Sequence, residues 1–370
     1  MVQANDRLTN AYLLRPNDRP PIVELEGGCS QPPYTPLEIV GDPSKNLESQ
    51  LLDIEGNLSV GTDYVPMLDM SLPFGTVMVP EAFGCPIEWT PDGVPWARPA
   101  ITAPRDVYAI RRPKVREASM IQRIKRHVEY AQQIIADVVP MQVIDLQSPY
   151  SAACQIWDAE ELMSAMFTDP KAVHHFLRIV TDFSIEFLQE YITWLDRPAF
   201  PGRNFPSIPD DIGPNIADDT PAIMLSPQQY EEFALPYNID VAEAFGGLSI
   251  HCCGDYNHQL DNQLKIPNLR AVQCHVGPGE MKPHPLVDIV KGRVTLWCDW
   301  NEVARAHYDS ARSLYEDFVL PHIRQLNKGL IVQGLGGNTT EEQRQNYQWL
   351  VDQFAAQEMV PTNRETVREP

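Results

Sequence analysis

The chain has 370 residues, of which 43% are hydrophobic, and its 29 basic and 50 acidic side chains give a net charge of -21. This acidic balance argues against nucleic acid or an anionic membrane as the main partner and favours an enzyme with a small-molecule substrate. No apolar run approaches the roughly 18 residues of a membrane helix, and we find no secretory signal. The odd number of cysteines, 7, predicts free or metal-bound thiols in the cytoplasm. The oligomeric state is left open, with a homodimer as one alternative.

The first part of the chain opens with a polar segment, residues 1–20, for which no element is predicted. A short strand is expected at Pro20–Glu26, a helix over 47–58, and a second strand over Thr62–Asp69. Residues 71–113 are then crowded with Pro, Gly and Trp. So many aromatic side chains do not stay solvated in a linker, so we expect this excursion to fold as a cover over the rest of the protein.

From residue 114 helical and extended patterns alternate. Asp169-Pro170 is typical of a helix cap followed by Pro in the first turn. Helices are expected at 114–137, 158–167, 171–195, 226–245, 256–266, 308–326 and 340–357, and strands at 138–146, 212–217, 247–251, 268–274, 293–298 and 330–333. Eight short strands that alternate with helices predict an α/β fold, a (β/α)8 TIM barrel. We assign residues 21–360 to this barrel and 361–370 to a C-terminal tail.

Polar residues gather where the predicted strands end, which is the rim on which barrel enzymes build their active sites. Each of them alone is explained by a capping or packing role, but together they predict one site. They are Glu26, Asp69, Asp218, Asp219, His251, Cys253, Cys274, His275, Cys298 and Asp299.

The most informative stretch is Leu248-Ser-Ile-His-Cys-Cys-Gly-Asp255. His251 and Cys253 are two residues apart on an extended strand, so their side chains point to the same face. Imidazole and thiolate on one face begin a zinc site, which usually has four ligands. The alternative is a buried cysteine beside a hydrogen-bonded histidine. Cys252 should face the other way.

Three segments in order resemble the uroporphyrinogen decarboxylase (URO-D) superfamily: Asp218–Tyr230, Leu235-Pro-Tyr237 and His251-Cys-Cys-Gly254. Ser148–Ala153 and Asp169–Val173 are similar to its third strand and following helix. The resemblance covers most of the chain from about residue 20 and is strongest to the cobalamin-dependent methyltransferases that act on corrinoid proteins and on thiols such as coenzyme M. It implies a (β/α)8 barrel, in agreement with the strand count.

The decarboxylases of this superfamily bind an acidic tetrapyrrole without a metal. The resemblance implies that Asp69 corresponds to their second-strand aspartate. Their arginine-bearing segment after the first strand is replaced here by Gly27-Gly-Cys-Ser-Gln31, and their late histidine is absent from Gly334-Leu-Gly-Gly337. A substrate with eight carboxylates also suits a chain of charge -21 poorly. We therefore keep decarboxylation as the second interpretation.

The methyltransferases hold zinc with a His-x-Cys pair and a later cysteine in a Gly-Cys-Gly turn. His251 and Cys253 match the pair, but Leu335 stands where the later cysteine is expected. We predict that Cys298 closes the site. Cys274 is the second choice, and Asp299 or His275 could supply an oxygen or a nitrogen.

The resemblance implies a zinc-assisted transfer of a methyl group between a corrinoid and a thiol or similar acceptor. Asp219 or Asp69 would take the proton or orient the acceptor. Trp89 and Trp96, in the excursion, are the candidate residues for binding the corrinoid, carried by a partner protein or free. The alternatives are a metal-independent decarboxylase and a non-catalytic ligand-binding barrel, and zinc content would separate them from methyl transfer.

Overall fold

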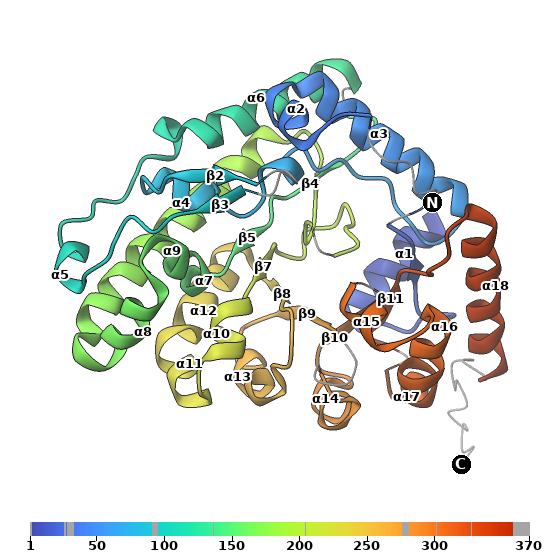
Figure 1. Cartoon of the computed structure of the whole chain (residues 1–370). Coiled ribbons are helices and arrows are strands. Elements are labelled where there is room, and N and C mark those ends of the chain that lie inside the picture. The colour runs from blue at the N-terminus through green and yellow to red at the C-terminus, as the bar shows by residue number, and fades with distance from the viewer. Residues whose placement is uncertain are drawn as a thin grey trace, which may run out of the picture.

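The computed structural model describes residues 2–25, 27, 33–90, 95–135, 137–203, 205–275, 281–300, 302–326 and 328–357. Its central element is a parallel sheet of seven strands in the order β1-β11-β10-β9-β8-β7-β5. Figure 1 shows these strands in an arc with helices outside it. The strands are β1 (Ile22–Val23), β5 (Leu146–Gln147), β7 (Asn215–Ala217), β8 (Leu248–His251), β9 (Leu269–Cys274), β10 (Thr295–Asp299) and β11 (Leu330–Gln333).

The ends of this sheet approach each other through shorter contacts. β4 (Met141–Gln142) precedes β5 and pairs with β6 (Pro198–Ala199), and Leu68 of the predicted second strand forms a parallel bridge to Met141. On the other side, the Asp63 N–H donates to the Ile22 carbonyl at 2.8 Å. The arrangement is consistent with the predicted barrel, although the hydrogen-bonded ladder of the described residues is not closed. The predicted ends of the third to eighth strands are confirmed to within one residue. The predicted second strand forms only the bridge at Leu68, and β1 ends at Val23, while Glu26 lies outside the described residues.

Helices follow the strands and cover the outside of the sheet, as predicted (Figure 1). The Asp169 side chain caps α9 by accepting from the Ala172 N–H, and Ser226 forms a capping box with Gln229. No described helix is long and apolar enough to cross a bilayer. The helices are α1 (Val2–Tyr12), α2 (Pro36–Gly41), α3 (Pro43–Val60), α4 (Met78–Ala82), α5 (Pro104–Val107), α6 (Ser119–Ile135), α7 (Pro149–Ile156), α8 (Ala159–Thr168), α9 (Pro170–Trp194), α10 (Asp219–Met224), α11 (Pro227–Phe233), α12 (Leu235–Phe245), α13 (Leu260–Gln263), α14 (Pro283–Val290), α15 (Glu302–His307), α16 (Ala311–Leu314), α17 (Leu320–Leu326) and α18 (Thr340–Ala356).

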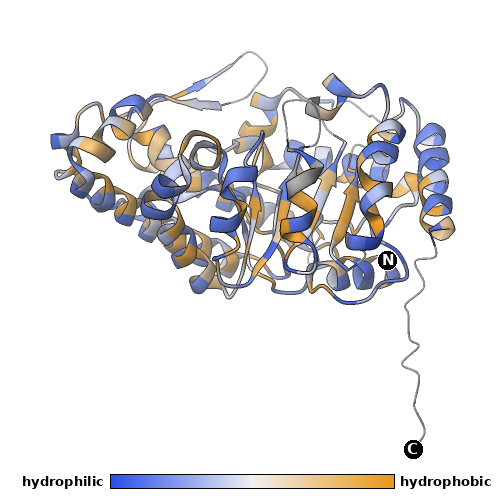
Figure 2. Cartoon of the chain, turned by 90° about the horizontal axis from the view of Figure 1, so that it is seen from below, coloured by the Kyte–Doolittle hydropathy of each residue, from blue (hydrophilic) through white to orange (hydrophobic). Residues whose placement is uncertain are grey.

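The excursion over 71–113 is folded, as its composition predicts. It contains α4, α5 and an antiparallel hairpin of β2 (Ile87–Trp89) and β3 (Pro95–Ala97). Figure 2 shows the hairpin projecting from the body of the molecule. Val107 of α5 and Cys85 before β2 are buried, so the base of the excursion is anchored in the hydrophobic core.

The N-terminal segment differs from the expectation, because residues 2–12 form α1. Its end packs where β10 begins: the Thr295 hydroxyl donates to the Ala11 carbonyl at 2.7 Å. The Tyr12 hydroxyl donates to the Pro206 carbonyl at 2.6 Å, and Leu8 and Ala11 are buried. The sequence did not predict this helix, because polar residues outnumber those of its short apolar face. Packing of that face against the barrel stabilises the helix.

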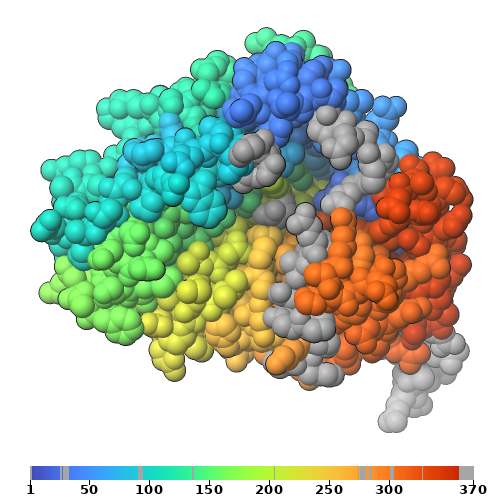
Figure 3. Space-filling model, in the orientation of Figure 1, coloured from blue at the N-terminus to red at the C-terminus, as the bar shows by residue number. Residues whose placement is uncertain are grey.

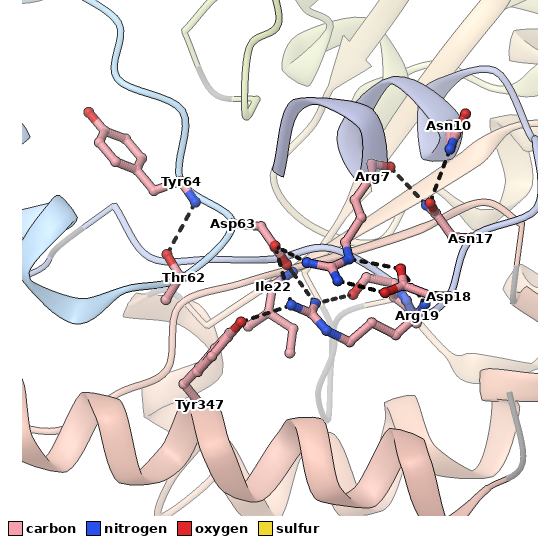
Figure 4. Close-up of polar contacts among 11 residues, drawn as sticks. Arg7, Asn10, Asn17, Asp18, Arg19, Ile22, Thr62, Asp63, Tyr64 and Tyr347 are labelled. Atoms are coloured by element: carbon pink, nitrogen blue, oxygen red, sulfur yellow. Dashed lines mark hydrogen bonds and ion pairs between the residues drawn. The ribbon is translucent and has the colours of Figure 1, made fainter. Parts of the chain in front are cut away.

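A buried ion-pair network fixes this segment (Figure 4). Asp63 accepts from Arg7 Nη1 at 2.8 Å and from Arg19 Nη1 at 2.6 Å, and it also accepts the backbone N–H of Ile22 at 2.9 Å. Arg19 Nη2 donates to the Tyr347 hydroxyl of α18 at 2.8 Å. One carboxylate thus joins the start of β1, the N-terminal segment and the last helix.

The fourth strand of the barrel is interrupted. β6 pairs with β4 and β7 pairs with β5, so both pieces lie beside the third strand. The described residues between them, 200–203 and 205–214, form an insertion, which we call the fourth-strand loop. Gly202 has a φ of +116°, and a Cβ there would lie 2.4 Å from the Val143 carbonyl oxygen, so only glycine fits this turn. Phe205 is then buried against Trp297 of β10, with ring centroids 4.7 Å apart. The fourth-strand loop between β6 and β7 therefore packs into the interior of the barrel.

Candidate active site

Three potential ligand side chains converge where β7 and β8 end. Ala217 and His251 are register partners, and the Asp218 N–H donates to the His251 carbonyl at 2.8 Å, which brings Asp219 beside the His251-x-Cys253 pair. One ligand atom from each of Asp219, His251 and Cys253 lies within 4.8 Å of the others. Cys253 Sγ is 3.5 Å from His251 Nε2, and the Cys253 N–H donates to Asp219 Oδ1 at 2.6 Å.

The orientation of His251 leaves one ring nitrogen available to a metal. Gln273 Nε2 donates to Asp299 Oδ2 at 3.0 Å, which turns the amide oxygen of Gln273 toward His251 Nδ1. Nδ1 therefore carries the proton and donates it to Gln273, and the lone pair of Nε2 faces Cys253. Burial, with a smaller effect from Arg203, lowers the pKa of His251 to about 4, so the ring is neutral at pH 7, as a metal ligand must be.

A second histidine and carboxylate extend this network. His275 Nε2 lies 3.7 Å from Asp299 Oδ1 and 3.2 Å from Gln273 Nε2. Burial, and then the neighbouring His251, lower the pKa of His275 to about 4. His275 and Asp299, both considered as ligands from the sequence, are joined to His251 through Gln273 and lie outside the converging cluster of Asp219, His251 and Cys253.

Asp218 and Asp219 are adjacent in the sequence but have different surroundings. Asp218 is fully buried, and its Oδ2 accepts from the Tyr230 hydroxyl at 2.5 Å and from Asn238 Nδ2 at 3.2 Å. It makes no side-chain cap to the helix that begins after it, so it ties the end of β7 to α11 and α12. Burial raises the pKa of Asp219, and the N–H of Cys253 opposes this shift.

The donor set of Asp219, His251 and Cys253 fits a zinc ion. A carboxylate oxygen, an imidazole nitrogen and a thiolate sulfur are all zinc ligands, and three protein ligands are the number that catalytic zinc sites use. The 3.5 Å between His251 Nε2 and Cys253 Sγ suits two ligands that bind at about 2.0 and 2.3 Å in a tetrahedral arrangement. The Gln273 contact supplies the outer hydrogen bond that ligating histidines usually make.

The structure does not bring Cys298 to this cluster, which corrects the predicted third ligand. Its neighbour Asp299 faces Gln273 inside the barrel, so Cys298 points to the opposite face of β10. Cys298 is fully buried there, toward Tyr308 and Tyr315 of the outer layer. The side chain of Cys274, the second choice, lies outside the described part of the structure.

Asp69 lies in a separate cavity of about 220 Å³, which Arg203, Gln142 and Leu25 also line. Its Oδ1 accepts from the Ser71 hydroxyl at 2.6 Å, and its Oδ2 is buried without a hydrogen-bond partner. Burial raises the pKa of Asp69, and Arg203 opposes the shift. Asp69 is therefore not in contact with the Asp219 cluster, and Arg203 is the charged residue within electrostatic reach of both Asp69 and His251.

A larger cavity of about 660 Å³ lies over the ends of β1, β10 and β11. Asp299 and Trp300 line it on one side and the Gly334–Gly337 turn on the other. Leu335, at the position of the methyltransferases' later cysteine, is buried, and its N–H donates to Glu24 Oε2 at 2.7 Å. Figure 3 shows this face of the molecule hollowed near its centre.

Trp89 and Trp96, the predicted corrinoid-binding residues, lie in the β2–β3 hairpin. Trp89 is half-buried and Trp96 is 64% exposed. Neither lines the two cavities described above. Arg203, which lines the cavity of Asp69, was not predicted from the sequence, because no motif marks a single arginine outside the predicted strands and helices.

Comparison with known proteins agrees with this fold. The sequence model of the uroporphyrinogen decarboxylase family (URO-D) matches residues 3–194, just over half of the chain. The chain belongs to the uroporphyrinogen decarboxylase family. No curated protein matches it in sequence at a significant level.

Two solved structures share the fold of this URO-D family chain. A methyltransferase from Methanosarcina mazei superposes with a TM-score of 0.66 at 16% identity, over 95% of this chain and 99% of that one. A B12-independent methionine synthase from Shewanella sp. W3-18-1, in complex with selenomethionine, superposes with a TM-score of 0.52 at 10% identity, over 92% and 99%. At these identities the likeness establishes a shared fold.

Proposed function

We propose that this URO-D family chain is a zinc-dependent methyltransferase that moves a methyl group between a corrinoid and a thiol or similar acceptor. The single observation that carries the proposal is the convergence of Asp219, His251 and Cys253 within 4.8 Å. The fold shared with a methyltransferase supports methyl transfer, and so does the fold shared with a methionine synthase, but that synthase is B12-independent, so the corrinoid part of the proposal rests on the sequence resemblance.

Asp219, His251 and Cys253 would hold the zinc, with the fourth position open to the acceptor. Bound zinc lowers the pKa of a coordinated thiol, so that the thiolate is available near neutral pH. Gln273 keeps the proton of His251 on Nδ1, and the backbone N–H of Cys253 orients Asp219. Asp299 and His275 are our candidates for the base that takes the proton released by the acceptor.

The corrinoid would reach the site from the hollow at the rim. The cavity of about 660 Å³ next to Asp299 is large enough for a small acceptor and part of a second reactant. Trp96 is our candidate contact for a corrinoid or its carrier protein, because it presents an exposed aromatic ring on the projecting hairpin.

The test is metal content together with methyl transfer. Purified protein should contain about one zinc per chain, and it should convert methylcobalamin and a thiol to the cob(I)alamin form and the methyl thioether, followed by absorbance and mass spectrometry. Loss of zinc and transfer together in His251→Ala and Cys253→Ala would support the proposal. A metal-free wild-type protein that releases CO2 from a carboxylated substrate would instead support the decarboxylase alternative, for which Asp69 is the candidate catalytic residue.

A further inference from the structure

A cavity of about 330 Å³ lies at the face of the barrel where β9 and β10 begin, opposite to the strand ends that carry the Asp219 cluster. Arg270 is the second residue of β9, and Arg293 comes two residues before β10. His275 follows the other end of β9, five residues from Arg270, and five residues of extended strand span about 16 Å. The cavity is therefore separate from the candidate active site.

The charge of this cavity contrasts with that of the chain. Arg270 and Arg293 line it, and none of the described residues that line it is acidic, although the net charge is -21. Neither arginine forms an ion pair with a described residue, and Arg270 Nη2 donates instead to the Gly246 carbonyl at 3.5 Å. Arg293 Nη1 donates to the Ile289 carbonyl, also at the weak limit of 3.5 Å. A guanidinium carries five N–H donors, so most of this capacity is unused.

Packing holds the Arg270 side chain in place. Its Nε is buried and has no hydrogen-bond partner among the described residues. A Cβ added at Gly247 would lie 3.1 Å from this nitrogen, so the glycine leaves the space that the side chain occupies. A partly buried cation without a counter-ion attracts an anion strongly, because little water screens its charge.

The rest of the cavity wall is apolar and contains strained backbone. Leu14 lines it together with Leu264 and Ile266. Leu14 and Asn268, which also lines the cavity, are the two non-glycine residues of the described structure with positive φ, at +52° and +51°. Asparagine tolerates this conformation, but a leucine is strained in it. The Leu14 side chain packs on Gly329, where a Cβ would lie 2.5 Å from Leu14 Cδ2, so the strain places an apolar side chain on this cavity.

We propose that this cavity binds a small organic phosphate through Arg270 and Arg293. The apolar part of the ligand packs against Leu14, Leu264 and Ile266. Two guanidiniums suit a phosphate, because its two negative charges balance theirs and its oxygens accept from their planar forks of donors. The volume of about 330 Å³ is that of a small-molecule site. The proposal goes beyond the proposed function and does not depend on it, since the cavity lies away from the Asp219 cluster.

The experiment compares benzyl phosphate with benzyl alcohol, its neutral counterpart, by titration calorimetry at constant ionic strength. Benzyl phosphate should bind at least about tenfold more tightly than the alcohol, because only the phosphate forms charge-assisted hydrogen bonds with the guanidiniums. Arg270→Met and Arg293→Met should each weaken the binding of benzyl phosphate by about tenfold or more and leave that of benzyl alcohol unchanged. Lysine at either position should keep part of the preference, since it keeps the charge. Removal of zinc with a chelator should change none of these affinities.

Arg324→Met, at an exposed position of α17, is the matched control and should bind benzyl phosphate as the wild type does. If the two compounds bind equally, or if both methionine variants keep the preference, the arginines only offset the carboxyl ends of α12 and α14 and the inference is wrong. Loss of binding on zinc removal would place the phosphate at the Asp219 cluster and would also overturn it. Melting temperatures show whether each variant is folded, and benzyl phosphate should raise that of the wild type but not that of either methionine variant.

Discussion

Asp219 Oδ1 accepts the backbone N–H of Cys253 at 2.6 Å. The contact places a carboxylate from the end of β7 next to a His-x-Cys pair from the end of β8. Since the two strands are neighbours in the sheet, their polar ends meet at one rim. The third potential ligand of the cluster thus comes from the adjacent strand.

Asp219→Asn should weaken zinc binding by at least about tenfold, because an amide is a poorer zinc ligand than a carboxylate. Metal affinity measured by competition with a chelator would check this, and turnover should fall with it. Asp261→Asn, at an exposed position of α13, serves as the control. Unchanged zinc affinity with a lower melting temperature would mean that Asp219 has only a structural role.

Gln273→Leu should also weaken zinc binding, by about 10- to 100-fold, because His251 would lose the acceptor that holds its Nδ1 proton. The cobalt-substituted protein gives a direct readout, since its absorption bands report ligand identity. We expect altered or weaker bands in the variant. Bands and affinity identical to wild type would show that Gln273 does not orient His251.

Cys298→Ser separates the sequence-based expectation from the structural one. We expect the variant to keep its zinc, since Cys298 faces away from the cluster, and to lose about 1–3 kcal/mol of unfolding free energy because a hydroxyl replaces a thiol in a buried apolar environment. Cys253→Ser should show the reverse pattern, with zinc lost and stability little changed. Release of zinc from the Cys298 variant would mean that Cys298 is a zinc ligand, as the sequence predicted.

Asp63→Asn should destabilise the fold by about 3–5 kcal/mol, because Arg7 and Arg19 would be left without their shared carboxylate. Urea unfolding would measure the loss. Asp18→Asn, which removes the exposed partner of Arg7, should cost much less. A similar loss in both variants would contradict the central role of Asp63.

His127 should make stability fall in mild acid. Burial lowers its pKa from 6.5 to about 4, and its Nδ1 accepts from Asn46 at 3.0 Å. Between pH 6.5 and about pH 4 the unfolded chain binds a proton at His127 that the folded protein does not bind. The unfolding free energy therefore decreases as the pH falls from 6.5 to 4, by at most about 3 kcal/mol. Above pH 6.5 His127 adds no pH dependence.

His127→Gln should flatten the pH dependence of unfolding between pH 6.5 and 4, measured in urea at several pH values. His258→Gln is the control, because His258 lies in a short turn and is only partly buried, so less of its ring is removed from water than of the His127 ring. An equally steep acid loss in the His127 variant would assign the effect to other groups.

Local pattern was sufficient to predict the alternation of strands and helices, the folded excursion and the His251-Cys253 pair. The two side chains do lie close together, 3.5 Å apart, although β8 ends at His251 and Cys253 lies beyond the strand, where the period of two no longer applies. Along β10 a period of two excludes Cys298 once Asp299 is known to face inward, but which of two adjacent residues faces inward depends on strand twist and register in the assembled sheet.

The sequence by itself determined the parallel α/β architecture and its polar rim, because hydrophobic periodicity and capping residues act over a few neighbouring positions. Only the tertiary structure decided the third member of the metal cluster, the place of Arg203 and the packing of α1. Asp219 meets Cys253 across two strands, and the turn at Gly202 brings Arg203 to the cavity that Asp69 lines. Such contacts depend on how distant segments pack, which no local pattern encodes.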